Sequence, residues 1–156
     1  MNIQYRWADH SDYIELGEVM FVAVREGRSL YNEQQRTAWV TSPRIGAEWD
    51  ERLSQQNIAL AISKGTIVGF MSLSEQGYLD LAYIRPEHQG TGIFRRLFNM
   101  INSLAVSQDQ GRIWTHASLM AQPAFEAIGF ETLSEESVSL NGQKFDRFVM
   151  QLKIAT

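Results

Sequence analysis

The segment from Gln89 to Arg96 combines two glycines, the start of a helix and two arginines. Gly90 and Gly92 have no Cβ, so backbone N–H groups there can approach a ligand closely and point together at an anion. Apolar residues then recur at helical spacing, and the N-terminus of such a helix carries a positive partial charge. The pattern predicts a phosphate-binding loop between a strand and a helix, with Arg95 and Arg96 beside it.

Two common phosphate motifs do not fit this loop. A Walker loop needs Gly-Lys-Ser/Thr, but Gly92 is followed by Ile93 and Phe94. A dinucleotide fingerprint needs a third glycine where Arg95 stands. Arginine is also a good helix former, so the two arginines could equally be solvated helix residues. The anion is therefore not identified by the loop alone.

Asp80 is the one carboxylate in an otherwise apolar strand that runs from Tyr78 to Ile84. Strand alternation places Asp80 on the same face as Ala82. Burial would raise the pKa of its carboxyl group toward that of a working general base. The alternative is a structural aspartate that pairs with an arginine or caps a turn. Asp80 is thus a candidate catalytic base.

His116 is a second candidate for proton transfer, because its unperturbed pKa lies near neutrality. It stands in a short strand from Trp114 to Ser118. A structural, hydrogen-bonded histidine is the alternative. The three histidines lack metal-ligand spacing, which argues against a zinc site. The chain has no cysteine, which excludes disulfides, thiolate catalysis and cysteine-bound metal.

Two motifs together resemble a known family. The run Gln89 to Phe94 resembles the Gln/Arg-x-x-Gly-x-Gly/Ala pyrophosphate-binding motif of the GCN5-related N-acetyltransferases, except that Phe94 stands where the family prefers a small residue. The run Ser118 to Phe130 is similar to the family's Asn-x-x-Ala-x-x-Phe-Tyr-Glu-x-Leu-Gly-Phe segment. The two motifs occur in the family's order.

The resemblance implies acetyl-CoA as co-substrate, and the histidine spacing noted above predicts no metal. In the family, the pantetheine arm pairs with strand backbone and the pyrophosphate lies on the glycine loop. The residues that this implies against the coenzyme are Ala82, Tyr83, Ile84, Gln89, Gly90, Thr91, Gly92, Ile93, Phe94, Arg95, Ser118 and Phe125. Phe125 replaces the tyrosine that usually protonates the coenzyme thiolate, and His116 could substitute for it.

The resemblance also implies transfer of an acetyl group to a primary amine of a small molecule or peptide, by direct attack on the thioester in a ternary complex. Tyr31, Gln34 and Trp39 are the residues that it places near the acceptor, although such residues often belong to a core. The alternative is a non-catalytic acyl-CoA-binding or protein-interaction module, which the departures at Phe94 and Phe125 suggest.

Composition restricts the possible partners and compartment. At 156 residues and 44% apolar content, the chain suits a single domain over residues 1–156. A net charge of −4 argues against a nucleic-acid surface. No run approaches the ~20 apolar residues of a membrane span, and we expect a cytoplasmic protein. Both a monomer and a homodimer remain open.

The order of predicted elements indicates an α+β fold in α/β/α layers. Three consecutive strands with short turns predict an antiparallel meander that ends at the glycine loop. The helix after the loop must cross over, so the strand at 113–118 should run parallel to the strand at 78–84. The predicted strands are 3–8, 58–63, 67–74, 78–84, 113–118, 133–140 and 144–154, and the predicted helices occupy residues up to 24, 31–40, 45–53 and 93–105. This order matches the acyltransferase fold, a mixed and mostly antiparallel sheet with a splayed parallel pair.

Overall fold

The computed structural model describes residues 2–154, which form a seven-stranded sheet in the order β1-β2-β3-β4-β5-β7-β6. All neighbouring strands are antiparallel except β4 and β5, which run parallel. The strands are β1 (Ile3–Trp7), β2 (Gln56–Ser63), β3 (Thr66–Ser74), β4 (Tyr78–Ile84), β5 (Arg112–Ser118), β6 (Glu131–Leu140) and β7 (Gln143–Lys153). The mixed sheet predicted from the sequence is confirmed.

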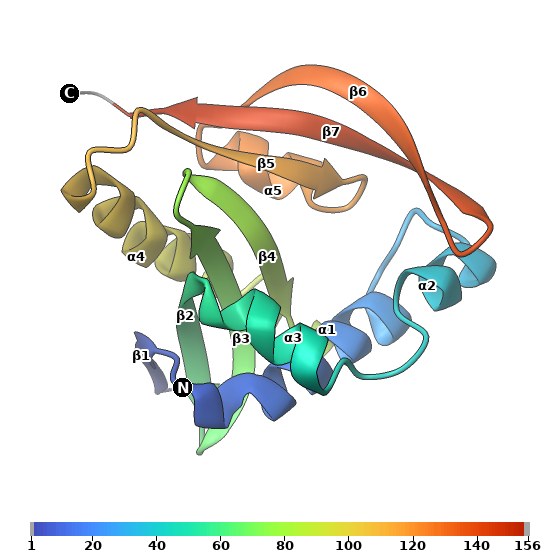
Figure 1. The fold of residues 1–156 in the computed structure, drawn as a ribbon, viewed down its shortest axis with the longest axis horizontal. Coiled ribbons are helices and arrows are strands. Elements are labelled where there is room, and N and C mark those ends of the chain that lie inside the picture. The colour runs from blue at the N-terminus through green and yellow to red at the C-terminus, as the bar shows by residue number, and fades with distance from the viewer. Residues whose placement is uncertain (1, 155–156) are drawn as a thin grey trace.

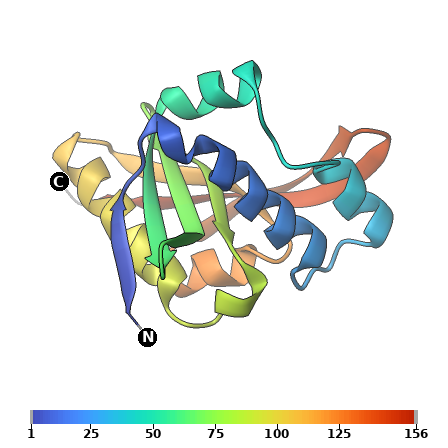
Figure 2. The same ribbon diagram turned by 90° about the horizontal axis from the view of Figure 1, so that it is seen from below.

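Helices cover both faces of this sheet (Figures 1 and 2). The helices are α1 (Tyr13–Glu26), α2 (Glu33–Trp39), α3 (Ala47–Ser54), α4 (Ile93–Ser107) and α5 (Gln122–Ala127), with short 3-10 turns η1 (His10–Asp12) and η2 (Pro86–His88). Helices α1 and α3 pack on one face, and α4 and α5 on the other. Helix α2 lies beside the turn of the β6–β7 hairpin, where the Asn141 side chain donates to Ala38 O at 2.8 Å. The layers agree with the predicted α/β/α arrangement.

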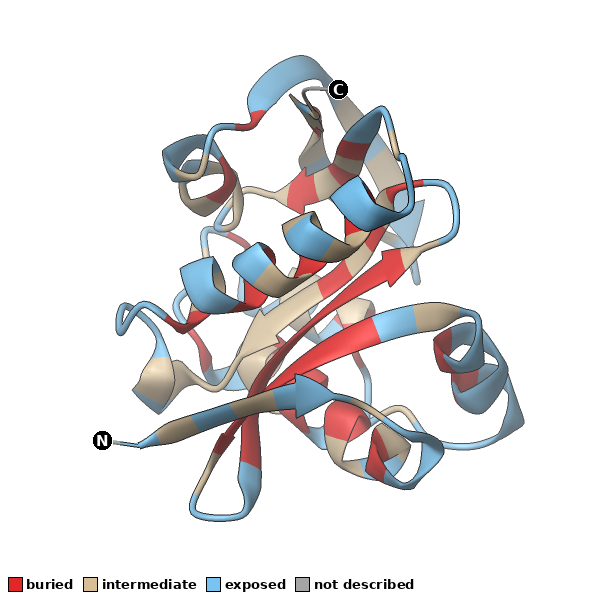
Figure 3. Cartoon of the chain, turned by 90° about the vertical axis from the view of Figure 1, so that its left-hand side faces the viewer, coloured by how far each residue is buried: buried red, intermediate tan, exposed pale blue. Residues whose placement is uncertain are grey.

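Apolar side chains fill the space on each side of the sheet. Buried residues follow the central strands and the inner sides of the helices, while the outer face of α4 is exposed (Figure 3). One cluster beneath α4 and α5 includes Leu97, Ile101 and Phe125, and another beneath α1 and α3 includes Leu16 and Leu53. These two clusters hold the central strands between fixed layers.

The parallel pair separates soon after it begins. Tyr78 pairs with Trp114 and Leu79 with Thr115, and the β4–β5 ladder ends there. The Thr115 hydroxyl donates to Leu79 O at 2.8 Å, which satisfies the last carbonyl of the ladder. Beyond this point the strands diverge, so the backbone from Asp80 to Ile84 on this side does not pair with β5. The predicted splay is therefore present.

A β-bulge at Asp80 corrects one detail of the sequence analysis. Ser72 pairs with Leu81 and Leu73 with Leu79, so Asp80 has no partner on β3. The Ser72 hydroxyl accepts a hydrogen bond from the Leu81 N–H at 3.1 Å. Leu79 consequently belongs to the cluster under α4, and Leu81 to the cluster under α1. Asp80 and Ala82 were expected on one face, but the extra residue moves Asp80 to the α3 side.

Turns and helix ends agree with the local sequence signals. Asp9 and Asp12 form a capping box at η1, and Gly27 ends α1. Asn141 and Gly142 have φ angles of 50° and 81°, as the predicted tight hairpin requires. Helix α2 starts only at Glu33, because the Asn32 side chain caps it. Within residues 2–154, no helix is long and apolar enough to cross a membrane.

Candidate active site

The glycine loop leads from β4 into α4 and has the geometry of an anion site. Gly90 and Gly92 have φ angles of 74° and 89°, which β-substituted residues rarely adopt. A Cβ on either glycine would meet nothing within 4 Å, so the space above the loop is open. The first N–H to bond back within the helix is that of Arg96, which donates to Gly92 O at 3.2 Å. The N–H groups before it are left for another acceptor, as at any helix N-terminus.

Polar side chains hold this loop in place. The Thr91 hydroxyl donates to His88 O at 2.6 Å, and the Gln89 amide donates to Ile84 O at 3.0 Å. Ile93, the first residue of α4, is 2% exposed and anchors the helix in the core. The loop is therefore positioned by contacts at both ends, and what it offers a ligand is mainly backbone.

A cleft of about 250 Å³ begins at the loop and follows the opening between β4 and β5. We call it the loop cleft. Its lining includes Ala82, Tyr83, Ile84, Gln89, Gly90, Phe94, Ser118, Ala121, Arg28, Tyr31 and Trp39. The lining is largely apolar, with the exposed cation Arg28 at one side. Most of the residues predicted to bind the coenzyme are thus brought together.

Phe94 and Phe125 take different places although both were predicted at the coenzyme. Phe94 is half-buried and lines the loop cleft. Phe125 is 2% exposed and packs edge-to-face on Phe94 and Phe130, with ring centroids 5.1 and 5.0 Å away. The structure therefore puts Phe125 in the core beneath the cleft and not in its lining.

The two arginines of the loop helix also diverge. Arg95 is exposed at the start of α4 and donates to Ala127 O at 3.4 Å. Arg96 stacks over the Tyr5 ring of β1, with 4.9 Å between its guanidinium carbon and the ring centroid. Arg95 therefore lies beside α5, whose Ala124 lines the loop cleft. Arg96 instead packs on β1 at the edge of the sheet.

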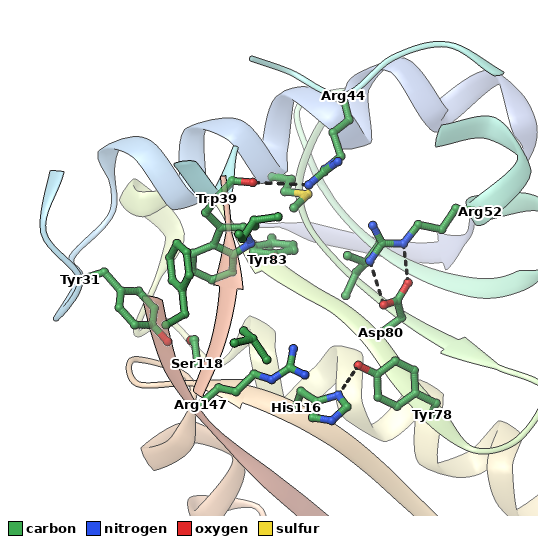
Figure 4. Close-up of a pocket in the computed structure, with 15 residues that line it drawn as sticks. Tyr31, Trp39, Arg44, Arg52, Tyr78, Asp80, Tyr83, His116, Ser118 and Arg147 are labelled. Carbon is green, nitrogen blue, oxygen red and sulfur yellow. Dashed lines mark hydrogen bonds and ion pairs between the residues drawn. The ribbon is translucent and has the colours of Figure 1, made fainter. Parts of the chain in front are cut away.

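A second cavity of about 250 Å³ adjoins the loop cleft on the α1–α3 side. We call it the arginine cavity, because Arg44, Arg52 and Arg147 line it (Figure 4). Its other lining residues include Tyr31, Trp39, Tyr78, Asp80, Tyr83, His116, Ser118, Leu140 and Phe145. The two spaces share Tyr31, Trp39, Tyr83 and Ser118. They therefore meet where β4 and β5 have separated.

Asp80 is engaged in an ion pair within the arginine cavity. Arg52 donates to both of its carboxylate oxygens, at 2.8 and 2.9 Å, and Gln56 donates to one of them at 2.7 Å. The carboxylate in turn raises the pKa of Arg52. This arrangement matches the alternative given in the sequence analysis, a structural aspartate paired with an arginine. The ion pair ties Arg52 of α3 to the bulge in β4.

His116 connects a tyrosine to a carboxylate. The Tyr78 hydroxyl lies 2.8 Å from His116 Nδ1 (Figure 4). On the other side of the ring, His116 Nε2 lies 3.4 Å from Glu136 Oε1. Burial, and then the nearby charge of Arg147, lower the pKa of His116, against the opposing effect of Glu136. Burial raises the pKa of Tyr78. A protonated Tyr78 therefore donates to a neutral His116, whose remaining proton faces Glu136.

Of the predicted acceptor residues, two lie at the junction of the two spaces and one does not. Tyr31 is 6% exposed, and its hydroxyl donates to Asp146 O at 2.6 Å. The Trp39 ring packs edge-on against Tyr83, with centroids 6.2 Å apart. Gln34 is exposed on the outer face of α2 and lines neither the loop cleft nor the arginine cavity.

The sequence analysis missed most polar residues of the arginine cavity. Arg44, Arg52 and Arg147 come from three separate segments that carry no motif. Tyr78 could have been found, because the predicted parallel pairing of β4 and β5 sets it beside Trp114 and therefore near His116. Within residues 2–154, no group of acidic, histidine or cysteine side chains is arranged to hold a metal ion.

Comparison with known proteins supports the family suggested by the two motifs. The family model described as an acetyltransferase (GNAT) domain matches residues 28–152. An uncharacterized N-acetyltransferase of Escherichia coli K12, YafP, is 29% identical over 153 residues, which cover 97% of each chain. The chain belongs to the GCN5-related N-acetyltransferase family, and it is an acyltransferase. The enzyme hypothesis is therefore retained over the non-catalytic module.

Solved structures of the family share the fold. A GCN5-related N-acetyltransferase from Rhodopseudomonas palustris superimposes with a TM-score of 0.89 at 23% identity, over 99% of this chain and 97% of the other. The putative acetyltransferase yncA from Salmonella typhimurium, solved with its cofactor acetyl-CoA, gives 0.71 at 19% identity, over 100% and 96%. At these identities the likeness establishes the fold.

Proposed function

We propose that the protein transfers an acetyl group from acetyl-CoA to the primary amine of a small molecule, within a ternary complex. The observation that carries this proposal is the meeting of two spaces at Tyr83 and Ser118. One space follows the glycine loop and the opened strand pair, as a long, phosphorylated thioester would require. The other is a polar cavity with a group able to accept a proton. A small amine suits the arginine cavity, whose ~250 Å³ lies below the ~300–1,000 Å³ of drug-sized pockets.

The loop cleft fits acetyl-CoA on two observations. Positive φ angles at Gly90 and Gly92, and open space above both, leave backbone N–H groups accessible to a pyrophosphate. The side of β4 that β5 has left offers hydrogen bonds to an amide-bearing pantetheine arm from the Ala82 N–H and C=O and from the Ile84 N–H. These groups face the opening because Leu81 and Arg85 direct their N–H groups to β3 and backbone directions alternate along a strand. The exposed side chain of Arg28 lines the cleft, and that of Arg95 is exposed at the start of α4, so both complement the negative charge of a pyrophosphate on the loop.

Acetyl-CoA supplies a thioester, and the amine nitrogen bonds to its carbonyl carbon as the carbon–sulfur bond breaks. The Ile84 N–H is the donor on the opened side of β4 that is placed for the carbonyl oxygen, because the Arg85 N–H bonds to Val68 O on β3 and the preceding N–H faces the other way. The half-buried rings of Tyr83 and Trp39 border this point and reduce its contact with water. Much of the rate would then come from orientation of the two reactants.

We assign proton transfer to the Tyr78–His116 pair. His116 and Ser118 lie two residues apart on one face of β5, so roughly 7 Å of strand separates His116 from the junction, a span that two waters in series bridge. The amine proton passes through these waters and the Tyr78 hydroxyl to His116 Nδ1, and Glu136 stabilises the resulting imidazolium. The same proton can return to the departing thiolate. The Tyr78–His116 pair would thereby take over the role of the family's tyrosine, whose position is occupied here by Phe125.

Asp80 has a different role in this scheme. Both of its carboxylate oxygens already accept hydrogen bonds from Arg52 and Gln56. Such a carboxylate is stabilised in its ionised form and is a weaker proton acceptor than a free one. We infer that Asp80 positions Arg52 and moderates the positive charge of the arginine cavity.

The test is a thiol-release assay with acetyl-CoA and a panel of small primary amines. Release that depends on an amine, with the N-acetylated product identified by mass spectrometry, supports the proposal. Tight acetyl-CoA binding without turnover of any amine, peptides included, would contradict it. A Lys64→Gln variant, altered in the exposed β2–β3 turn, should behave like the native enzyme and controls for handling of the protein.

A further inference from the structure

The arginine cavity carries more positive than negative charge, on a protein whose overall charge is −4. Three guanidinium groups line it, from Arg44, Arg52 and Arg147. Arg52 is neutralised by Asp80 at 2.8 Å, and Arg147 by Glu136 at 2.6 Å. Three cations against two carboxylates leave one positive charge, and that charge is on Arg44.

Arg44 is poorly satisfied by the protein. Within residues 2–154 no carboxylate lies within 4.0 Å of it, and Glu48, which lines the adjoining groove with it, is not an ion-pair partner at that distance. Its Nε atom is buried and has no hydrogen-bond partner among these residues. The one hydrogen bond found for its side chain runs from Nη2 to Trp39 O at 3.4 Å. A partly desolvated guanidinium with unused donors is unfavourable unless an anion meets it.

The position of Arg44 is built into the fold. Its backbone packs directly on Gly17 of α1, where a Cβ would lie 2.0 Å from Arg44 O. Only a glycine in α1 allows this approach, and the Arg44 side chain then extends toward Trp39 and Tyr83 (Figure 4). Burial raises the pKa of Tyr83, and the charges of Arg52 and, more weakly, Arg44 oppose that rise. Arg44 therefore lies within electrostatic reach of the junction where the amine must react.

We propose that the acceptor is a small amino acid, whose amine reaches the junction while its carboxylate is bound by Arg44. This inference rests on the proposed function and narrows its substrate class. A planar carboxylate matches the donors that Arg44 leaves unused. A polyamine is disfavoured, because several cations would enter a cavity that already has an excess positive charge.

The experiment compares each of several amino acids with two partners of similar size, its carboxamide and its decarboxylated amine, in the thiol-release assay. The native enzyme should have a kcat/KM about 10- to 100-fold higher for the acid, as a charge-assisted pair of hydrogen bonds provides. Arg44→Gln should lose this preference, and Arg44→Lys should keep part of it. Lys153→Gln removes one positive charge at an exposed end of β7 and should leave the preference unchanged.

The outcomes separate the two proposals. Calorimetric binding of acetyl-CoA confirms that each variant is folded. Equal kcat/KM for acids, amides and amines, or a preference for acids that survives Arg44→Gln, would overturn the amino acid as acceptor and leave the acetyltransferase proposal standing. If acetyl-CoA binds but no amine in the panel is acetylated, the proposed function fails and this inference fails with it.

Discussion

The loop cleft and the arginine cavity are neighbours, but the chain builds them in opposite ways. The loop cleft offers a ligand the backbone of one continuous stretch, β4 through the start of α4, with glycines where the backbone is exposed, and side chains from α1, α2 and the α5 region complete its walls. The arginine cavity is made of side chains from α1, α2, the loop before α3, α3 itself, β4, β5 and the β6–β7 hairpin. A site of the first kind keeps its form across many sequences, whereas one of the second kind changes with each side chain. The first suits a constant coenzyme and the second a particular acceptor.

The largest effect is expected from breaking proton transfer while the loop cleft stays intact. His116→Gln removes the group that accepts the proton, so kcat should fall about 100-fold or more, with the dissociation constant of acetyl-CoA unchanged. Tyr78→Phe keeps the ring and loses the hydroxyl, and should lower kcat by a smaller factor. His10→Gln, an exposed histidine in η1, is the matched control. An undiminished kcat in His116→Gln would remove His116 from the reaction.

The same group predicts the pH dependence of the reaction. Burial and then Arg147 lower the pKa of His116 from the ordinary value of 6.5. A protonated imidazole cannot accept a proton, so kcat should be constant at neutral pH and fall as the pH decreases through a midpoint below 6.5. The profile of kcat against pH should lose this limb in His116→Gln. A midpoint above 6.5 would contradict the assignment.

Features set by local sequence signals were predicted, whereas features set by tertiary contacts were not. The strands, the α4 helix and the glycine loop were predicted because local signals specify them, such as Asn141-Gly142 at the hairpin and the apolar spacing of α4. The bulge at Asp80 was not, because it depends on how β3 and β4 pair and leaves no mark in the composition of β4. The arginine cavity depends on tertiary contacts, such as that between Gly17 and Arg44, which no local pattern reveals.

A smaller effect is expected at Asp80, and it separates two roles. If Asp80 positions Arg52, Asp80→Asn should lower the acceptor kcat/KM by about tenfold and the free energy of unfolding by about 1 kcal/mol, since the Arg52 side chain is 40% exposed. If Asp80 is instead the general base, kcat itself should fall by about 100-fold or more. Asp12→Asn breaks the ion pair of Asp12 with Arg6, remote from the cavity, and should affect stability without changing kcat.

The smallest effect on turnover is expected from restoring the family's tyrosine. Phe125 lies in the core beneath the loop cleft, so the hydroxyl in Phe125→Tyr would be buried among aromatic rings. We expect kcat to stay unchanged and the free energy of unfolding to fall by about 1–3 kcal/mol. Chemical denaturation and steady-state kinetics measure both quantities. A kcat raised about tenfold would mean that position 125 does reach the thiolate.

Calorimetric titration with acetyl-CoA tests most directly whether the loop cleft holds the coenzyme independently of the arginine cavity. The native protein and Arg44→Gln should bind with equal, micromolar dissociation constants. Gly92→Glu places a carboxylate where the pyrophosphate would lie and should abolish binding. Gly65→Glu is the matched control. Gly65 has a φ of +79°, against +89° at Gly92, and equally open space around it, but it lies in the β2–β3 hairpin. This variant should bind acetyl-CoA like the native protein. Native-like binding by Gly92→Glu, or no binding by the native protein, would contradict the account.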